Sequence, residues 1–305
     1  MGQINNNFLI AEEKVFSGAL SCRGCGWSLL VRHLASILGE NTVYVVPASC
    51  FSIIAGPYPL NELKGNVVHT VFAAAPATAT GIRAALDRQG KTDTNVVVLA
   101  GDGGTFDIGF QSLSGAATRG EEMLYICNNN GAYMNTGIQS STATPYGAVT
   151  TTNPSANFRK IWPKDLIGII AAHNIPYVAT ASLAFLKDYR EKIEKAISLK
   201  GFKLLMIDGP CPPGHRTEPS QSIEVTRLAV ESNLFPLYEV EYGKYKINHF
   251  PKNKVQVEEC LKLQGRFKHL FEEDKKSTIE EIQNMTDFNW KKLKLLEKMN
   301  ADLAN

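Results

Sequence analysis

Residues 95–110 read NVVVLAGDGGTFDIGF, an apolar run that ends in an aspartate flanked by glycines. The segment 95–102 has the length and β-branched content of a strand buried on both faces, as in a parallel sheet. Glycines allow a backbone to approach a phosphate closely, and a following helix offers free N–H groups. The stretch therefore predicts a strand, a phosphate-binding turn and a helix.

Similar runs recur on both sides of this stretch. We predict further strands at 41–46, 66–72, 122–128, 177–182 and 202–209, and helices at 28–38 and 165–174. This alternation is typical of βαβ units, so the predicted fold class is α/β, with a mostly parallel sheet and helices on both faces. His33, His69 and His173 lie within these patterns and are expected in the core. In such sheets, ligands bind at the carboxyl ends of the strands.

Two of the loops after predicted strands carry metal-binding groups. The first is Gly101-Asp102-Gly103-Gly104, whose aspartate would repel a bare diphosphate but could hold a divalent cation that bridges to it. The second follows the next strand and contains Asn130 and Ala132. One strand–helix–strand unit brings the chain back to the same edge of a parallel sheet. The Asn130 amide oxygen and the Ala132 carbonyl can therefore reach the metal held by Asp102.

The six cysteines, at 22, 25, 50, 127, 211 and 260, present a separate question. Cys22 and Cys25 form a Cys-x-x-Cys pair, and Cys50 and Cys211 follow predicted strands. These four thiols, on loops at one end of a sheet, can converge on zinc or on an iron–sulfur cluster, and spacing alone leaves both open. Cys127 ends an apolar strand and is expected to be buried.

The C-terminal third differs in pattern from the rest. We predict a domain at 1–215, followed by an extension at 216–305 made of a hairpin near 237–250 and a charged helical tail. Residues 129–163 form a long polar segment with little periodicity, which is typical of a functional loop or of disorder.

Composition limits the classes of function. The 305 residues are 44% hydrophobic and 20% charged, with a net charge of +2, so no nucleic acid and no membrane are expected as partners. The N-terminus lacks a secretory pattern, and no apolar run reaches 18 residues. We expect a cytoplasmic globular protein.

The segments GDGGTFDIGF and YICNNNGAYMNTGIQSSTATPYGA resemble the thiamine diphosphate signature of the 2-oxoacid:ferredoxin oxidoreductases, in particular the separate β subunit of the multi-subunit pyruvate enzymes. The similarity covers about residues 18–265 and includes LKLQGRFKHL at 261–270. It implies thiamine diphosphate bound with Mg²⁺ through Asp102, Asn130 and Ala132. It also implies that Asn135 faces the substrate and that Gly101, Gly103, Gly104 and Thr136 contact the cofactor.

The resemblance decides between the metals. Cys22, Cys25, Cys50 and Cys211 match the ligands of the 4Fe-4S cluster nearest the thiamine ring, whereas Cys127 and Cys260 match no ligand position. The partners implied are α-type and ferredoxin-like subunits of the same complex, with ferredoxin as electron acceptor. Related enzymes take the carboxylate that acts on the aminopyrimidine ring from a different domain or subunit.

The expected reaction is oxidative decarboxylation of a small 2-oxoacid, with pyruvate and coenzyme A giving acetyl-CoA. Where the similar enzymes usually read Tyr-Asp-Asn-Glu-Ala-Tyr, this chain reads Asn128-Asn129-Asn130-Gly131-Ala132-Tyr133 and loses two carboxylates. That loss could suit a more anionic substrate such as oxalate, which would need no coenzyme A. A non-oxidative thiamine enzyme and a zinc-stabilised nucleotide-binding or scaffolding module are the rival interpretations.

Overall fold

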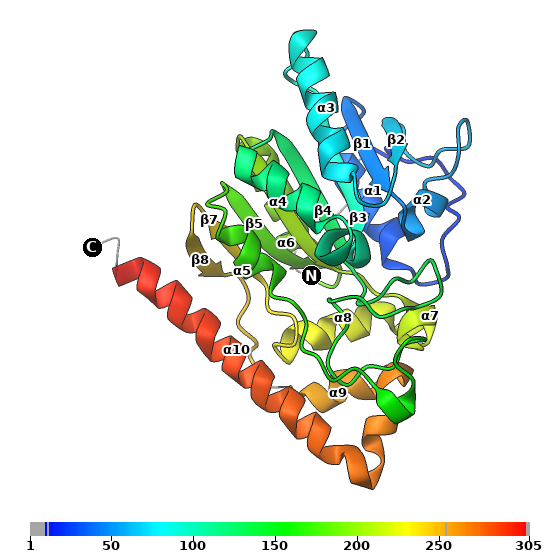
Figure 1. The fold of residues 1–305 in the computed structure, drawn as a ribbon, viewed down its shortest axis with the longest axis vertical. Coiled ribbons are helices and arrows are strands. Elements are labelled where there is room, and N and C mark those ends of the chain that lie inside the picture. The colour runs from blue at the N-terminus through cyan, green and yellow to red at the C-terminus, as the bar shows by residue number, and fades with distance from the viewer. Residues whose placement is uncertain (1–9, 11, 254, 303–305) are drawn as a thin grey trace, which may run out of the picture.

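The computed structural model describes residues 10, 12–253 and 255–302. Within them, the chain forms one sheet of eight strands in the order β2-β1-β3-β4-β6-β5-β7-β8 (Figure 1). The strands are β1 (Thr42–Pro47), β2 (Asn66–Thr70), β3 (Asn95–Gly101), β4 (Met123–Asn129), β5 (Tyr177–Ser182), β6 (Phe202–Asp208), β7 (Tyr238–Glu241) and β8 (Lys244–Ile247). β1 to β6 run parallel, which confirms the predicted fold class.

Helices cover both faces of the sheet. α1 (Gly26–Leu38), α2 (Cys50–Ile54) and α6 (Leu186–Ser198) pack on one face, and α3 (Ala75–Arg88), α4 (Phe110–Arg119) and α5 (Leu166–Ala171) pack on the other. Alternate residues of β3 face opposite cores: Val97 and Leu99 one way, Val98 and Ala100 the other. A strand buried on both faces must be apolar throughout, which explains the unbroken run in the sequence.

Two predictions need correction at the level of single residues. The helix predicted at 165–174 ends at Ala171, and Asn174 takes a left-handed conformation with φ 55° that no helix can continue. His69 is exposed, because β2 is the outermost parallel strand of the sheet. His33 is buried as expected, and His173 is half-buried.

The predicted hairpin is present and extends the sheet. β7 pairs antiparallel with β5 and with β8. The two residues between β7 and β8, Tyr242 and Gly243, both have positive φ, at 47° and 79°. Positive φ at both central positions gives a hairpin turn whose twist matches the strands. Residues 216–305 therefore contribute strands to the same sheet as the first part of the chain.

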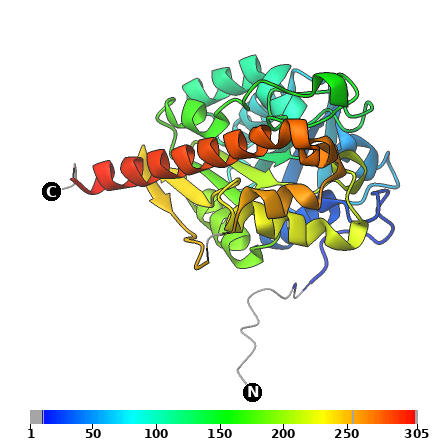
Figure 2. The ribbon, with the colours of Figure 1, turned by 90° about the horizontal axis from the view of Figure 1, so that it is seen from below.

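The other segments after β6 lie across the carboxyl ends of the strands (Figure 1). They contain α7 (Pro212–His215), α8 (Ser222–Glu231), α9 (Val257–Lys262), the 3₁₀ segment η5 (Gly265–Phe271) and the long α10 (Lys276–Asp302). α10 packs on β8, α9 and η5 and runs as a straight rod past the body (Figure 2). Short turns at Gly103–Asp107 (η2), Ser155–Asn157 (η3), Pro219–Gln221 (η4) and Glu273–Lys275 (η6) complete the elements. No described helix has the length and apolarity that crossing a membrane requires.

Candidate active site

The two loops singled out in the sequence lie side by side. β3 and β4 are neighbouring parallel strands, with Gly101 opposite Asn128. Asp102 therefore leaves the end of β3 next to the point where Asn130 leaves the end of β4. This is the expected place for a ligand in a parallel sheet, because the strand ends and their loops form a crevice there.

Three oxygen-bearing groups meet at this point. One end of the Asn130 side-chain amide lies 2.9 Å from Asp102 Oδ1 and 3.0 Å from the carbonyl oxygen of Ala132. With the amide nitrogen at this end, the side chain donates hydrogen bonds to both oxygens. With the amide oxygen at this end, three acceptors face one another and can share a cation.

The separations fit a magnesium ion. Octahedral Mg²⁺ with ligands at about 2.0–2.1 Å places neighbouring ligand oxygens about 2.8–3.0 Å apart. Carboxylate, amide and backbone carbonyl oxygens are also the ligands that hard cations bind. Asp102, Asn130 and Ala132 thus have both the spacing and the chemistry for Mg²⁺.

The burial and the hydrogen bonding of the Asp102 carboxyl favour binding of a cation. It is 1% exposed, and Ser141 Oγ donates a hydrogen bond to its second oxygen, Oδ2. Burial raises the pKa of the Asp102 carboxyl to about 7, against the lowering effect of Ser141. A buried carboxylate is costly without an opposite charge, and a bound cation supplies one.

A second aspartate, Asp107, holds the long loop over the site. It accepts hydrogen bonds from Tyr133 Oη at 3.0 Å and from the Thr142 backbone N–H at 3.1 Å, and another from the Thr142 hydroxyl. Gly103 permits this packing, because a Cβ there would lie 2.3 Å from Tyr133 Cε1. The sequence analysis did not single out Ser141 or Asp107. The position of Asp107 at the end of GDGGTFD could have indicated a role at the site, whereas Ser141 lies in a polar segment with no comparable pattern.

The residues predicted to bind the cofactor line one cavity of about 100 Å³. Its walls include Gly101, Asp102, Gly103, Gly104, Asn130, Ala132, Asn135 and Thr136. Trp27, Cys50 and Phe72 also line it, so the cavity joins the three candidate metal ligands to a cysteine and to aromatic side chains.

Cys22, Cys25, Cys50 and Cys211 also come together. Cys22 and Cys25 form a turn closed by the Cys25 N–H donating to the Cys22 carbonyl at 3.1 Å. Burial raises the pKa of Cys25 to about 11, and the charges of Cys211 and Cys22 add to the increase. Burial likewise raises the pKa of Cys50 to about 12, with Cys211, Cys25 and Cys22 adding. The loops that carry them are also in contact: the Gly26 N–H donates to the Pro210 carbonyl at 3.0 Å, and the Trp27 ring stacks on the Phe51 ring at 4.7 Å.

The four cysteines are not arranged around a single metal ion. Within residues 10, 12–253 and 255–302, no three His, Cys, Asp or Glu side chains are arranged to hold a metal ion. A multi-iron cluster is a larger body than a zinc ion, so its ligands stand further apart. Cys127 and Cys260 lie elsewhere and are buried: Cys127 in β4, and Cys260 with its Sγ 3.5 Å from the Val225 carbonyl.

Comparisons with known proteins agree with this geometry. Residues 48–207 match a family model described as the C-terminal TPP binding domain of thiamine pyrophosphate enzymes. The chain is 45% identical over 299 residues to the ketoisovalerate oxidoreductase subunit VorB of Pyrococcus horikoshii, covering 94% of each chain. It is 43% identical over 297 residues to the pyruvate synthase subunit PorB of Methanocaldococcus jannaschii, covering 93% of this chain and 97% of that one.

Lower similarity extends to another relative and to a solved structure. The chain is 36% identical to the PorB subunit of Thermotoga maritima, over 98% of this chain and 97% of that one. A 2-oxoglutarate:ferredoxin oxidoreductase from Magnetococcus marinus superposes with a TM-score of 0.58 at 24% identity, covering 72% of this chain and 80% of that chain. This structural match supports the fold.

Proposed function

The chain belongs to the family of the VorB and PorB subunits of thiamine diphosphate-dependent 2-oxoacid:ferredoxin oxidoreductases, and we propose that it is the subunit that binds thiamine diphosphate and Mg²⁺. The proposed reaction is the oxidative decarboxylation of a small 2-oxoacid, with pyruvate as the first candidate substrate. The observation that carries this proposal is the cavity in which Asp102, Asn130 and Ala132 meet, with Cys50 in the same wall. The three oxygens have the spacing that Mg²⁺ requires, and Cys50 is a proposed ligand of the iron–sulfur cluster that would accept the electrons.

Each residue of the site has a part in binding. Asp102 would offset part of the charge of the Mg²⁺, and Asn130 and Ala132 would complete its protein ligands. Gly103 and Gly104 let the turn after β3 approach the diphosphate closely, and Asn135 and Thr136 line the cavity beside it. When bound, thiamine diphosphate supplies the electron sink that decarboxylation requires.

We further assign one 4Fe-4S cluster to Cys22, Cys25, Cys50 and Cys211. A hydrogen bond between the loops of two of these cysteines supports the assignment: the N–H of Gly26, next to Cys25, donates to the carbonyl of Pro210, next to Cys211, at 3.0 Å. The charges of Cys211, Cys25 and Cys22 also raise the pKa of Cys50. Burial disfavours free thiolates at Cys25, Cys50 and Cys211, so these thiols stay protonated until metal binding displaces the protons. Because Cys50 also lines the cofactor cavity, electrons released there would have a short path to the cluster.

The cluster assignment is tested by changing the six cysteines to serine one at a time in the purified complex. We expect iron content and the EPR signal of the reduced protein to fall for the variants at 22, 25, 50 and 211. The variants at 127 and 260 are matched controls, since both thiols are buried and lie outside the group. Equal loss at all six positions would indicate misfolding and remove the support for ligation.

Substrate choice follows from the relatives and from the loop after β4. PorB relatives support pyruvate with coenzyme A, and VorB relatives make ketoisovalerate the second candidate. Residues 129–131 contribute no carboxylate to the site, which keeps oxalate as a further alternative.

One assay separates these substrates. The purified native complex is given pyruvate, ketoisovalerate or oxalate, with and without coenzyme A, and ferredoxin reduction is followed. We expect the highest kcat/KM with pyruvate and a requirement for coenzyme A. Turnover of oxalate without coenzyme A would replace the proposed substrate, and decarboxylation without ferredoxin reduction would indicate a non-oxidative enzyme.

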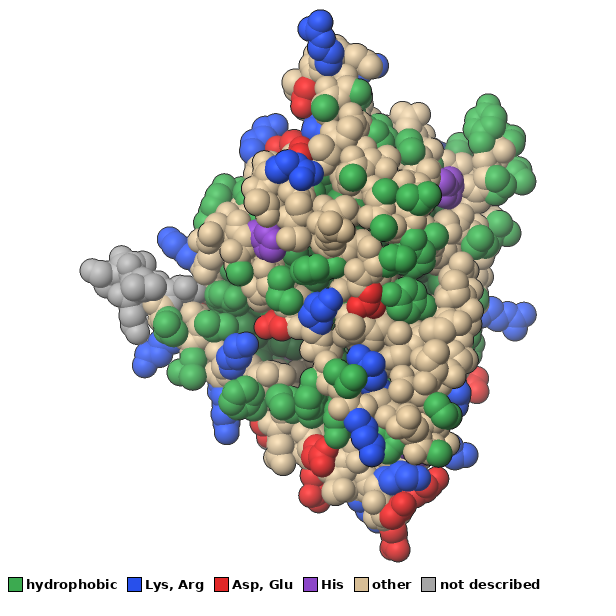
Figure 3. Space-filling model, viewed as in Figure 1, with side chains coloured by type: hydrophobic (Ala, Val, Ile, Leu, Met, Phe, Trp, Pro, Cys, Tyr) green, Lys and Arg blue, Asp and Glu red, His purple; other side chains and the backbone are tan. Residues whose placement is uncertain are grey.

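The surface beside the cavity supports a shared active site. Val71, next to cavity-lining Phe72, is 72% exposed, and Tyr58 and Leu60 in the loop between α2 and β2 are 95% and 78% exposed. Hydrophobic side chains gather on this loop at the upper right of Figure 3. Exposed apolar groups near a cofactor site mark a surface that another protein covers. We assign this surface to an α-type subunit, with a ferredoxin-like subunit nearby to pass electrons to ferredoxin.

A further inference from the structure

The backbone carbonyl of Asn130 is held by two buried side chains, which line a different cavity from the one that contains Asp102. His215 Nε2 lies 2.8 Å from this oxygen, and Arg266 Nη1 donates to it at 3.3 Å. His215 is 4% exposed and Arg266 is 8% exposed. A carbonyl only accepts, so His215 must carry its proton on Nε2, and the two donors use both lone pairs of the oxygen.

Each of these side chains is fixed by its own element. His215 ends α7, which begins directly after Cys211, and the His215 N–H donates to the Cys211 carbonyl at 2.8 Å. Arg266 lies in η5, where its Nε donates to Gln264 Oε1 at 3.0 Å. The Asp208 carboxylate offsets part of the charge of the Arg266 guanidinium. The two donors therefore reach Asn130 from elements that are themselves anchored.

The Asn130 loop needs such support because it separates two cavities. On one side is the cavity of about 100 Å³ with the metal-binding oxygens. On the other is a larger cavity of about 270 Å³, which Asn130 and Gly131 also line, together with Asp208, His215 and Arg266. Without the two donors, the loop has free volume behind it into which it can retreat from the metal.

We propose that His215 and Arg266 are positioning residues for the metal site: by holding the Asn130 carbonyl from behind, they direct the Asn130 side chain and the Ala132 carbonyl toward Asp102. This inference deepens the proposed function and depends on it. Groups that orient metal ligands through hydrogen bonds typically change metal affinity about 10- to 100-fold when removed. Because α7 begins directly after Cys211, His215 also connects the loop that carries Cys211 to the Asn130 loop by a single turn of helix.

The test uses two variants that differ by one methylene group. In His215→Gln, the amide nitrogen has about the reach of Nε2, whereas in His215→Asn it stops short of the Asn130 carbonyl. The intact complex is stripped of divalent metal with a chelator and titrated with Mn²⁺ at fixed thiamine diphosphate, and free Mn²⁺ is read by EPR. We expect about 10-fold weaker Mn²⁺ binding for His215→Asn and for Arg266→Met. His215→Gln should stay within about threefold of the parent.

Controls distinguish positioning from general packing. His269→Asn changes a different buried histidine, which lies in η5 and packs against the Phe158 ring, and should leave Mn²⁺ affinity unchanged. Melting temperature without metal reports any loss of fold separately. Parent-like Mn²⁺ affinity in both His215→Asn and Arg266→Met would overturn the inference. A parent complex that binds no Mn²⁺ with thiamine diphosphate would overturn the proposed function itself, and the inference with it.

Discussion

At the scale of single residues, Asp102 shows how a binding site opposes stability. Its carboxyl is 1% exposed, its pKa is raised by burial, and the groups around it are arranged for a cation. The apo chain therefore keeps a buried acid whose charged form is disfavoured. Binding of the proposed Mg²⁺ would recover this cost.

Replacing Asp102 with alanine should leave the chain folded and weaken Mg²⁺-dependent binding of thiamine diphosphate by about 100-fold, because it removes the one carboxylate of the proposed ligand set. Calorimetry of the complex measures the affinity, and Asp274→Ala, at an exposed position, is the control. Wild-type affinity in Asp102→Ala would end the metal assignment.

Glu62 provides a pH-dependent test away from the metal oxygens. It is 8% exposed, its Oε2 has no hydrogen-bond partner, and burial raises the pKa of its carboxyl to about 7. The fold favours the protonated form, so the stability from this group is complete below its unfolded pKa of about 4.3 and is lost as pH rises through 7.

Glu62→Gln stays neutral at every pH and should remove this loss. We expect the melting temperature of the variant to exceed that of the parent by a margin that is small at pH 5 and grows up to pH 8. Melting curves at pH 5, 6, 7 and 8 measure the difference, and Glu280→Gln, at an exposed position, should show none. A constant difference across this range would mean that the Glu62 carboxyl does not titrate as described.

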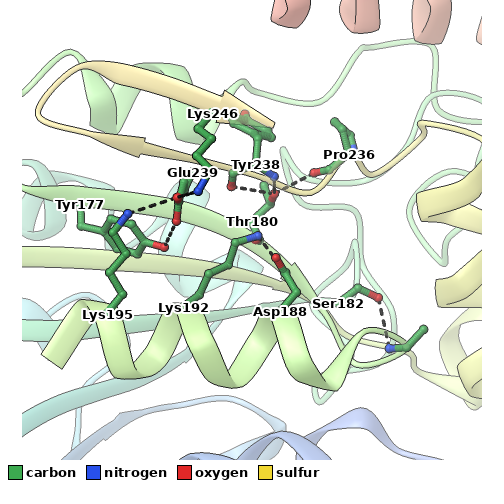
Figure 4. A network of polar contacts seen from close by, with 11 residues as sticks. Tyr177, Thr180, Ser182, Asp188, Lys192, Lys195, Pro236, Tyr238, Glu239 and Lys246 are labelled. Carbon is green, nitrogen blue, oxygen red and sulfur yellow. Dashed lines mark hydrogen bonds and ion pairs between the residues drawn. The ribbon is translucent and has the colours of Figure 1, made fainter. Parts of the chain in front are cut away.

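At the scale of elements, a buried lysine joins α6 to the sheet (Figure 4). Lys192 Nζ donates to the Thr180 carbonyl on β5 and to Asp188 Oδ2, both at 2.8 Å, and its side chain is 2% exposed. The Thr180 hydroxyl in turn donates to the Pro236 carbonyl at 2.7 Å and accepts from the Tyr238 N–H at 2.9 Å. This network attaches the hairpin strand β7 to the parallel sheet.

We expect Lys192→Met to lower the free energy of unfolding by about 2–4 kcal/mol, because it leaves Asp188 and the Thr180 carbonyl without their donor. The double variant Lys192→Met/Asp188→Leu should recover part of the loss. Lys187→Met on the same helix is the control: its ion pair with Glu191 is exposed, at 3.7 Å, and is worth less than about 1 kcal/mol. Urea unfolding of the chain measures all three, and equal losses at 187 and 192 would refute the role of burial.

At the scale of the whole molecule, the site is complete on the diphosphate side only. Among the described residues that line the cofactor cavity, Asp102 is the sole carboxylate, and it is assigned to the metal. The carboxylate expected to act on the aminopyrimidine ring is therefore absent from this wall. Together with the exposed apolar loop between α2 and β2, this supports the proposed contact with an α-type subunit.

The chain alone should accordingly be inactive. After reconstitution with iron, sulfide, Mg²⁺ and thiamine diphosphate, we expect dye reduction with 2-oxoacids at least about 100-fold below that of the complex, because one catalytic group is missing. The reconstituted complex is the positive control. Robust turnover by the single chain would refute the shared site.

The sequence by itself determined the parallel strands and the position of the two loops of the candidate site. The central residues of β3 and β4 are apolar because both faces of the sheet are buried, so each strand could be recognised from its own residues. Asp102 and Asn130 could be paired in advance, because consecutive parallel strands end at the same edge of a sheet.

Only the tertiary structure decided which loops meet across the chain. His69 lies in a strand-like run but is exposed, because strand order makes β2 an edge strand. Ser141, His215 and Arg266 reach the Asp102–Asn130 site from segments with no periodic pattern. The physical reason is that apolar periodicity records how much of an element is buried, whereas a contact between two loops depends on how the elements beneath them pack, which no local run of residues encodes.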